Sequence, residues 1–175
     1  PILWINQTNH LKPERQAAIT LEPGCLGPYT PARRLSVSPQ HRILLRSAIV
    51  ARMFGGSEVF VAAKHLLAVT GIKQSLGFLP VQYHHFACAR HEIVFANGTE
   101  VETFFAGQQA ITALSDSDVQ QIRPEISRTE IEANCKPARP IAAGKRLRHM
   151  IHRHQKNGRD LVEQSYVCDS VGLTA

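Results

Sequence analysis

The alternation of apolar and polar positions is clearest over residues 36–45. Val37, Ile43 and Leu45 occupy odd positions, and polar residues hold most of the even ones. This period of two is typical of a strand with one buried face. Pro39 interrupts the pattern, because its ring fixes φ and favours an extended residue before it. The pattern therefore predicts a strand over residues 33–45 that bends at Pro39.

The bend carries a hydroxyl-x-x-imidazole unit, formed by Ser38 and His41. His41 shares the odd parity of the apolar residues, so it is expected to face inward if the register continues through the bend. A buried imidazole needs a partner, because burying an unpaired polar group is costly. Two roles fit this position: a structural histidine bonded to a nearby carbonyl, or a functional group of a site.

Short apolar and polar blocks separated by turn signals fill the first hundred residues. Asn97-Gly98, between blocks at residues 91–96 and 99–105, is the strongest short hairpin signal in the chain. Residues 48–54 are apolar and fit either a strand or a helix, and residues 62–67 fit one or two helical turns. Further strand candidates are residues 17–21, 58–61 and 81–86. Short strands with regular turns predict a mainly β domain.

The period changes after Gly107. Residues 115–118 have the pattern of an N-cap followed by acids, so a helix is expected over residues 115–122. Residues 145–155 show the clearest helical pattern, an apolar stripe opposite a basic face, and Asn157-Gly158 is a stop signal. The stripe consists of Leu147, Met150, Ile151 and His154.

These patterns predict three parts. A β domain covers residues 1–114, a helical C-terminal extension with a proline-marked linker covers residues 115–160, and a loose tail covers residues 161–175. A length of 175 residues is enough to bury a sizeable core.

The net charge of +6 is concentrated in the extension. Residues 136–160 contain eight Lys and Arg residues and a single acidic one, so the rest of the chain is close to neutral. A basic helix face can bind nucleic acid or another anionic surface. No aromatic residues are interleaved with these cations, however, and packing of the helix on the β domain explains its apolar stripe equally well. The sequence therefore argues against nucleic acid as the partner.

Composition limits the remaining classes. The hydrophobic content of 43% is typical of a globular protein, and no run approaches the roughly 18 apolar residues of a membrane-spanning helix. The first residues lack the positively charged start that is typical of a signal peptide, so none is expected in this stretch. The chain opens at Pro1 with apolar residues directly after it, which suggests a fragment or processed piece of a longer polypeptide.

Cysteine and histidine spacing indicates no metal and no cofactor. The four cysteines lie far apart without a C-x-x-C pair, which argues against a zinc knuckle and a disulfide scaffold. His84, His85 and His91 lie close in sequence, but adjacent strand residues point to opposite faces, so at most one of His84 and His85 can join His91. Their spacing also matches none of the usual zinc signatures.

Residues 35–45, Leu-Ser-Val-Ser-Pro-Gln-His-Arg-Ile-Leu-Leu, resemble the hydroxyl-x-x-His block of Hint domains, the self-processing modules of hedgehog proteins and inteins. The likeness is closest to the bacterial branch of that family. This branch pairs the block with a strand like residues 58–66 and a closing segment like residues 91–98. Residues 1–4 and 17–27 resemble the strands that precede the histidine block. The resemblance implies a curved, mainly β Hint-type fold with short helices and a C-terminal helical extension.

The resemblance also implies autoproteolysis. In such domains a first-residue thiol or hydroxyl attacks the carbonyl before it, and a second nucleophile cleaves the resulting (thio)ester. The reaction needs an acid at the departing nitrogen and donors for the oxyanion. Carried over to this sequence, His41 is the imidazole at the scissile amide and Ser38 is the hydroxyl that orients the bond, where the family more often has Thr. His91 is the histidine of the closing block.

Two departures from the family pattern shape the functional expectation. The block with the nucleophile would lie before Pro1, and Cys25 does not replace it, because it follows Gly24 inside a predicted turn. Residues 99–103 stand where splicing inteins have a closing His-Asn pair, so full splicing is not expected. We expect an intact parent that cleaves its own flanking polypeptide, and an inactive chain without the nucleophile. The resemblance to the bacterial branch implies a secreted or extracellular location. The alternative function is that of a non-catalytic β module whose basic helix binds an anionic partner such as nucleic acid.

Overall fold

The computed structural model describes residues 1–11, 13–105 and 136–163. Within these ranges nine strands form three antiparallel sheets, accompanied by two α-helices and two 3-10 helices. The strands are β1 (Ile2–His10), β2 (Ile19–Leu21), β3 (Leu35–Val37), β4 (Arg42–Arg46), β5 (Glu58–Ala62), β6 (Ile72–Gln74), β7 (Val81–Cys88), β8 (Ile93–Ala96) and β9 (Thr99–Glu102). The helices are η1 (Glu14–Gln16), α1 (Ala48–Phe54), η2 (Ala63–Leu66) and α5 (Gly144–Asn157). The mainly β fold with a C-terminal helix is confirmed.

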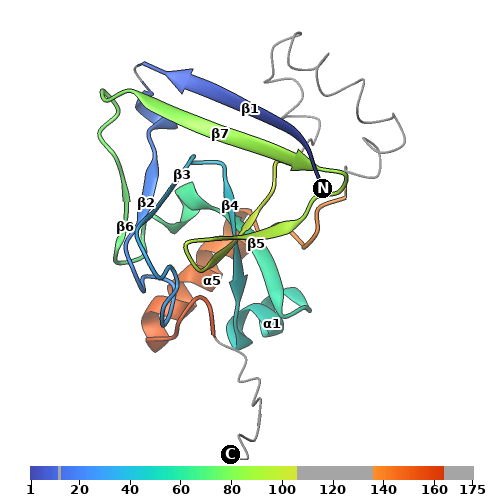
Figure 1. Ribbon diagram of the computed structural model, residues 1–175. Helices are drawn as coiled ribbons and strands as arrows, with labels where there is room; N and C mark the ends of the chain where they lie inside the picture. The colour runs from blue at the N-terminus through green and yellow to red at the C-terminus, as the bar shows by residue number, and fades with distance from the viewer. Residues whose placement is uncertain (12, 106–135, 164–175) are drawn as a thin grey trace, which may run out of the picture.

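The three sheets are small, with two, three and four strands. Strands β1 and β7 form a long two-stranded ribbon across one end of the molecule (Figure 1). The order β3-β2-β6 makes a second sheet, and β5-β4-β9-β8 makes the third. Helix α1 packs against α5, away from the ribbon.

Strand β4 is the centre of the core. It has β5 on one side and β9 on the other, and Ile43, Leu44 and Leu45 are all at most 1% exposed. Leu44 occupies an even position, so the period of two does not extend through this strand. A strand covered on both faces buries successive residues, and the apolar run between Arg42 and Arg46 has this character.

The strand expected to bend at Pro39 is two strands in different sheets. β3 pairs with β2, whereas β4 pairs with β5 and β9. Between them, the His41 amide donates to the Ser38 carbonyl at 3.1 Å and closes a turn with Pro39 at its second position. Amides of Ala63 and Lys64 in η2 donate to the carbonyls of His41 and Pro39. The turn is therefore held by its own hydrogen bond and by two from η2, which together fix the backbone that carries the Ser38 and His41 side chains.

The predicted Asn97-Gly98 hairpin is confirmed. β8 and β9 pair directly, with Ala96 opposite Thr99. Asn97 and Gly98 have φ of 50° and 81°, the positive values that a two-residue type I′ turn requires. Residues 48–54, for which the sequence allowed a strand or a helix, form helix α1. The Ser47 side chain caps its N-terminus, and Gly55 with φ 74° ends it.

The expected helix at residues 145–155 is present as α5, and its apolar stripe is buried. Leu147, Met150, Ile151 and His154 are each at most 5% exposed, and the first three belong to the same core cluster as β4 and β5. His154 also contacts the Ser47 hydroxyl through Nε2 at 3.1 Å.

The segment after α5 also reaches the core. Leu161 and Val162 are buried, and the amides of Val162 and Glu163 donate to the carbonyls of Leu26 and Arg46. The predicted tail is therefore packed over its first three residues, and residues 164–175 lie outside the described residues. The helix expected over residues 115–122 and the boundary at residue 114 also lie outside them, so the three-part division of the chain stays a prediction. None of the helices in the described ranges is long and apolar enough to span a membrane.

Docking of α5 makes a direct stability prediction. Met150 is fully buried, so Met150→Ala should lower the free energy of unfolding by about 2–5 kcal/mol through lost burial and the cavity left behind. His149 is the exposed neighbour on the same helix, and His149→Ala should change it by less than about 0.5 kcal/mol. Urea denaturation of both variants measures the difference. Equal stability of Met150→Ala and the unsubstituted chain would mean that α5 is a detached arm.

Candidate active site

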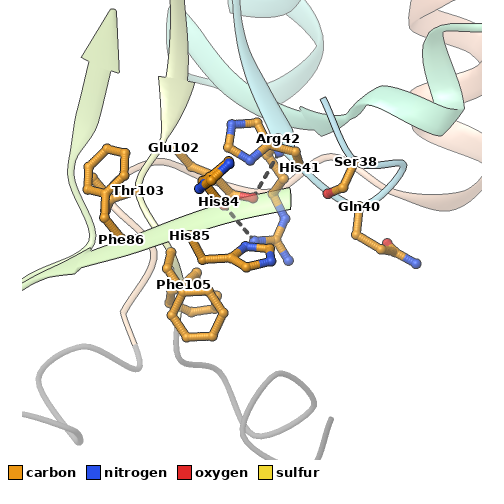
Figure 2. Close-up of a pocket in the computed structure, with 11 residues that line it drawn as sticks. Ser38, Gln40, His41, Arg42, His84, His85, Phe86, Glu102, Thr103 and Phe105 are labelled. Atoms are coloured by element: carbon orange, nitrogen blue, oxygen red, sulfur yellow. Dashed lines mark hydrogen bonds and ion pairs between the residues drawn. The ribbon is translucent and has the colours of Figure 1, made fainter. Parts of the chain in front are cut away.

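A pocket opens where the turn before β4 meets β7 and the end of β9. Its volume is about 180 Å³, and residues from all three segments line it (Figure 2). The lining residues are Ser38, Gln40, His41, Arg42, His84, His85, Phe86, Glu102, Thr103, Phe104 and Phe105. Segments far apart in sequence thus bring imidazoles, a carboxylate and hydroxyls to the lining of one pocket.

His41 is half-buried in this pocket, and its ring has no hydrogen-bond partner among the described residues. The structural role considered above, a ring bonded to a nearby carbonyl, is therefore not what these residues show. Burial lowers the pKa of His41 below its ordinary value of 6.5, and the charge of Glu102 opposes this shift without cancelling it. The imidazole is mainly neutral at neutral pH, so it can accept a proton and then donate it.

Ser38 lines the same pocket as His41, because both flank the Pro39 turn. Two of the three residues singled out from the sequence therefore lie together. The hydroxyl and the imidazole sit on a turn whose Pro39 and His41 carbonyls accept from η2 and whose chain continues directly into β4, which gives the pair a fixed base.

Glu102 is the anionic group of the site. Its Oε2 accepts from Arg42 Nη1 at 2.7 Å, and its Oε1 accepts from the Arg42 backbone amide at 2.8 Å (Figure 2). Burial alone would raise the pKa of Glu102, but the contacts with His91 and Arg42 outweigh burial and hold that pKa below its ordinary value of 4.5. The carboxylate is therefore ionised and carries a negative charge beside His41.

His91 does not line the pocket. Its side chain is fully buried behind it, between the rings of Phe60 and Phe105, whose centroids lie 5.2 and 4.7 Å away. Nε2 lies 3.1 Å from Glu102 Oε2, but its N–H does not point straight at that oxygen, so the atom lacks a well-directed hydrogen bond among the described residues. His91 is therefore joined to the pocket through Glu102.

The neighbouring histidines on β7 differ in environment. His84 is exposed, whereas His85 is half-buried and its Nε2 lies 3.1 Å from Thr8 Oγ1. Burial, with smaller contributions from the nearby His10 and His84, lowers the pKa of His85. Among residues 1–11, 13–105 and 136–163, no three His, Cys, Asp or Glu side chains gather as a metal ion would need.

Cys25 lies away from the pocket and is a poor nucleophile. It sits in the turn after β2, and burial is the main cause that raises the pKa of its thiol to about 11. Only a minute fraction is thiolate at neutral pH, and the thiolate is the reactive form. The described lining of the pocket contains no cysteine.

Sequence reasoning missed Glu102 and its partner Arg42. Ile43 pairs with Val101 across β4 and β9, which sets Arg42 opposite Glu102. The available signal was an arginine at the start of the apolar β4 run and a glutamate at the end of β9, since oppositely charged cross-strand pairs stabilise sheets. The register between two strand residues that are 60 positions apart was needed to turn that signal into a contact.

A comparison with protein families supports the relationship suggested by the residues. The profile of the Hint domain family matches residues 1–108, which is more than half of the chain. The chain belongs to the Hint domain family. The matched region of this Hint domain contains Ser38, His41, His91 and Glu102, and Hint domains are generally associated with autoprocessing. Neither the curated proteins nor the solved structures include a significant match.

The Glu102 contacts predict a pH-dependent stability. The folded pKa lies below the ordinary value of 4.5, so its contribution is present above about pH 4.5 and is lost as the pH falls through the folded pKa. Near neutral pH, Glu102→Gln should lower the free energy of unfolding by about 1–3 kcal/mol, because a buried donor loses its anionic partner. The difference from the unsubstituted chain should shrink below about pH 4.5.

Glu92 provides the matched control, since its side chain is exposed and next to His91. Glu92→Gln should leave both the stability and its pH profile nearly unchanged, within about 0.5 kcal/mol. Urea denaturation from pH 3 to 8 measures all three proteins. An identical acid profile for Glu102→Gln and the unsubstituted chain would show that Glu102 is not held by these contacts.

Proposed function

We propose that this Hint domain provides the proton-transfer side of an autoprocessing site. In the intact parent it promotes an N-to-S or N-to-O acyl shift and self-cleavage of a peptide bond. The observation that carries the proposal is that Ser38 and His41 lie on one hydrogen-bonded turn and line one pocket, where the His41 ring has no hydrogen-bond partner among the described residues. An imidazole without a structural hydrogen bond and with a lowered pKa suits proton transfer.

The acyl shift requires that one proton move from the nucleophile to the departing nitrogen. A thiol or hydroxyl that precedes this region attacks the carbonyl carbon of the bond before it, so a C–S or C–O bond forms and the C–N bond breaks. The nucleophile's proton passes to His41, and His41 passes it to the departing nitrogen, which leaves as an amine. A second nucleophile of a class that stays open, such as water, a thiol or an amine, then attacks the (thio)ester and releases the upstream polypeptide.

The other residues of the site assist this transfer. The Ser38 hydroxyl orients the scissile bond, and the Glu102 carboxylate favours the imidazolium form that His41 adopts between the two transfers. His91 contacts Glu102 from behind and helps to set its position. We assign His91 a positioning role, because its buried ring does not face the pocket.

The His41 role is tested in the restored protein, in which a nucleophile-bearing Hint block precedes Pro1. His41→Ala should reduce the rate of thiol-induced cleavage at least about a hundredfold while the domain still folds, since a positioned acid–base group contributes about 10²- to 10⁴-fold. Ser38→Ala should reduce it less, and Ser38→Thr should recover most of the loss because the hydroxyl is kept. Intact-mass time courses beside thermal melts measure both properties.

His65 serves as the control, because it is an exposed histidine in η2 outside the pocket. His65→Ala should cleave at the parental rate. If His41→Ala melts early but cleaves at the parental rate below its transition, His41 is a packing residue and the assigned role is wrong.

The 175-residue chain itself should be inert towards hydroxylamine and thiols. None of its residues matches the family's nucleophile, and the Cys25 thiol, whose pKa is raised to about 11, is not among the residues that line the pocket. Intact-mass analysis after incubation should show only the full-length species. A discrete cleavage product would place the nucleophile inside these residues.

A further inference from the structure

His91 is a fully buried imidazole with a different group at each ring nitrogen. The backbone amide of Ala138 donates to Nδ1 at 3.1 Å. On the other side, Nε2 lies 3.1 Å from Glu102 Oε2. Ala138 lies outside the family-matched residues 1–108, whereas His91 and Glu102 lie inside them.

The Ala138 contact determines the tautomer of His91. A neutral imidazole has one donor nitrogen and one acceptor nitrogen, and a backbone N–H can only donate. Nδ1 must therefore accept, which places the ring proton on Nε2, the nitrogen that lies 3.1 Å from the Glu102 carboxylate. The opposite tautomer would set N–H against N–H at Ala138 and a lone pair against an anion at Glu102.

The segment that carries the Ala138 amide is hydrogen-bonded to β5. The Phe60 amide donates to the Pro140 carbonyl at 2.8 Å, and the Ala142 amide donates to the Phe60 carbonyl at 2.9 Å, so Ile141 bridges Phe60 in parallel. Arg139 forms an ion pair with Glu58. These contacts on both sides of the strand bridge give residues 138–142 a fixed position against the sheet.

From His91 the contacts continue to the pocket. Glu102 receives the His91 Nε2 contact on the same oxygen that accepts from Arg42 Nη1. Its other oxygen accepts from the Arg42 backbone amide, directly after His41 in the chain. The orientation of the carboxylate beside His41 therefore depends on contacts from β4 on one side and His91 on the other.

We propose that the backbone amide of Ala138 is a positioning group of the site, which fixes the tautomer of His91 and through it the Glu102 carboxylate beside His41. The segment at residues 138–142 then completes the site of the family-matched region. The catalytic consequence of this inference rests on the proposed function, whereas the tautomer does not.

The first test uses the unsubstituted 175-residue chain with ¹⁵N-labelled histidine and backbone. We expect His91 to show a protonated Nε2, an unprotonated Nδ1, and a scalar coupling across the hydrogen bond between Ala138 N and His91 Nδ1. A protonated Nδ1, or the absence of this coupling in a slowly exchanging Ala138 amide, would overturn the inference without any substitution.

The second test removes the donor. Ala138→Pro lacks the N–H and should give a mixed or reversed His91 tautomer, while Ala138→Gly keeps the N–H and should preserve the parental ring shifts. If Ala138→Pro folds and retains the parental ring shifts, Ala138 does not set the tautomer and the inference is wrong.

The third test uses the restored protein and separates the two proposals. Ala138→Pro should slow cleavage about ten- to a hundredfold, as expected when a catalytic group is slightly misplaced, and Ala138→Gly should not. Parental cleavage by a folded Ala138→Pro variant would remove the positioning role and leave the proposed function intact. If His91 carries its proton on Nε2 but the restored protein never cleaves, the proposed function is wrong and the tautomer assignment stands.

Discussion

The site depends on the contacts that the ionised carboxylate of Glu102 makes with Arg42 and His91. A buried charge is stable only when it is paired and hydrogen-bonded, so Glu102 requires Arg42 and His91 close to it. Those partners come from β4 and from the segment before β8. One carboxylate therefore ties the central strand, the β8–β9 hairpin and a buried ring together at the base of the pocket. It also supplies negative charge where an imidazole would carry a transient positive one.

The C-terminal helix belongs to the same packing unit as the β sheets. α5 buries its apolar stripe in the core, and the residues before and after it are bonded to β5 and β4. Its basic face stays exposed. Packing against the β sheets explains the apolar stripe of α5, whereas it does not explain the positive charge on the exposed face.

Local patterns predicted much of this fold because they reflect local physics. The Asn97-Gly98 turn needs two positive φ values, the α5 stripe has a helical period, and Ser38 and His41 share a turn set by Pro39. What the sequence could not provide was register. Glu102 meets Arg42 only because Ile43 pairs with Val101, and Ala138 meets His91 only because residues 140–142 join β5. The buried position of Leu44 likewise follows from strands on both sides, which no local alternation encodes.

The central claim is that His41 carries a proton between the nucleophile and the departing nitrogen, and chemical rescue tests it most directly. In the restored protein, His41→Gly enlarges a pocket that already measures about 180 Å³, so added imidazole can occupy the vacated space. Thiol-induced cleavage is followed by intact mass, with the unsubstituted restored protein plus imidazole as the blank for direct attack on the ester. The account predicts slow cleavage by His41→Gly that rises with imidazole concentration, and little change in the blank. A folded His41→Gly variant that cleaves at the parental rate without imidazole would contradict it.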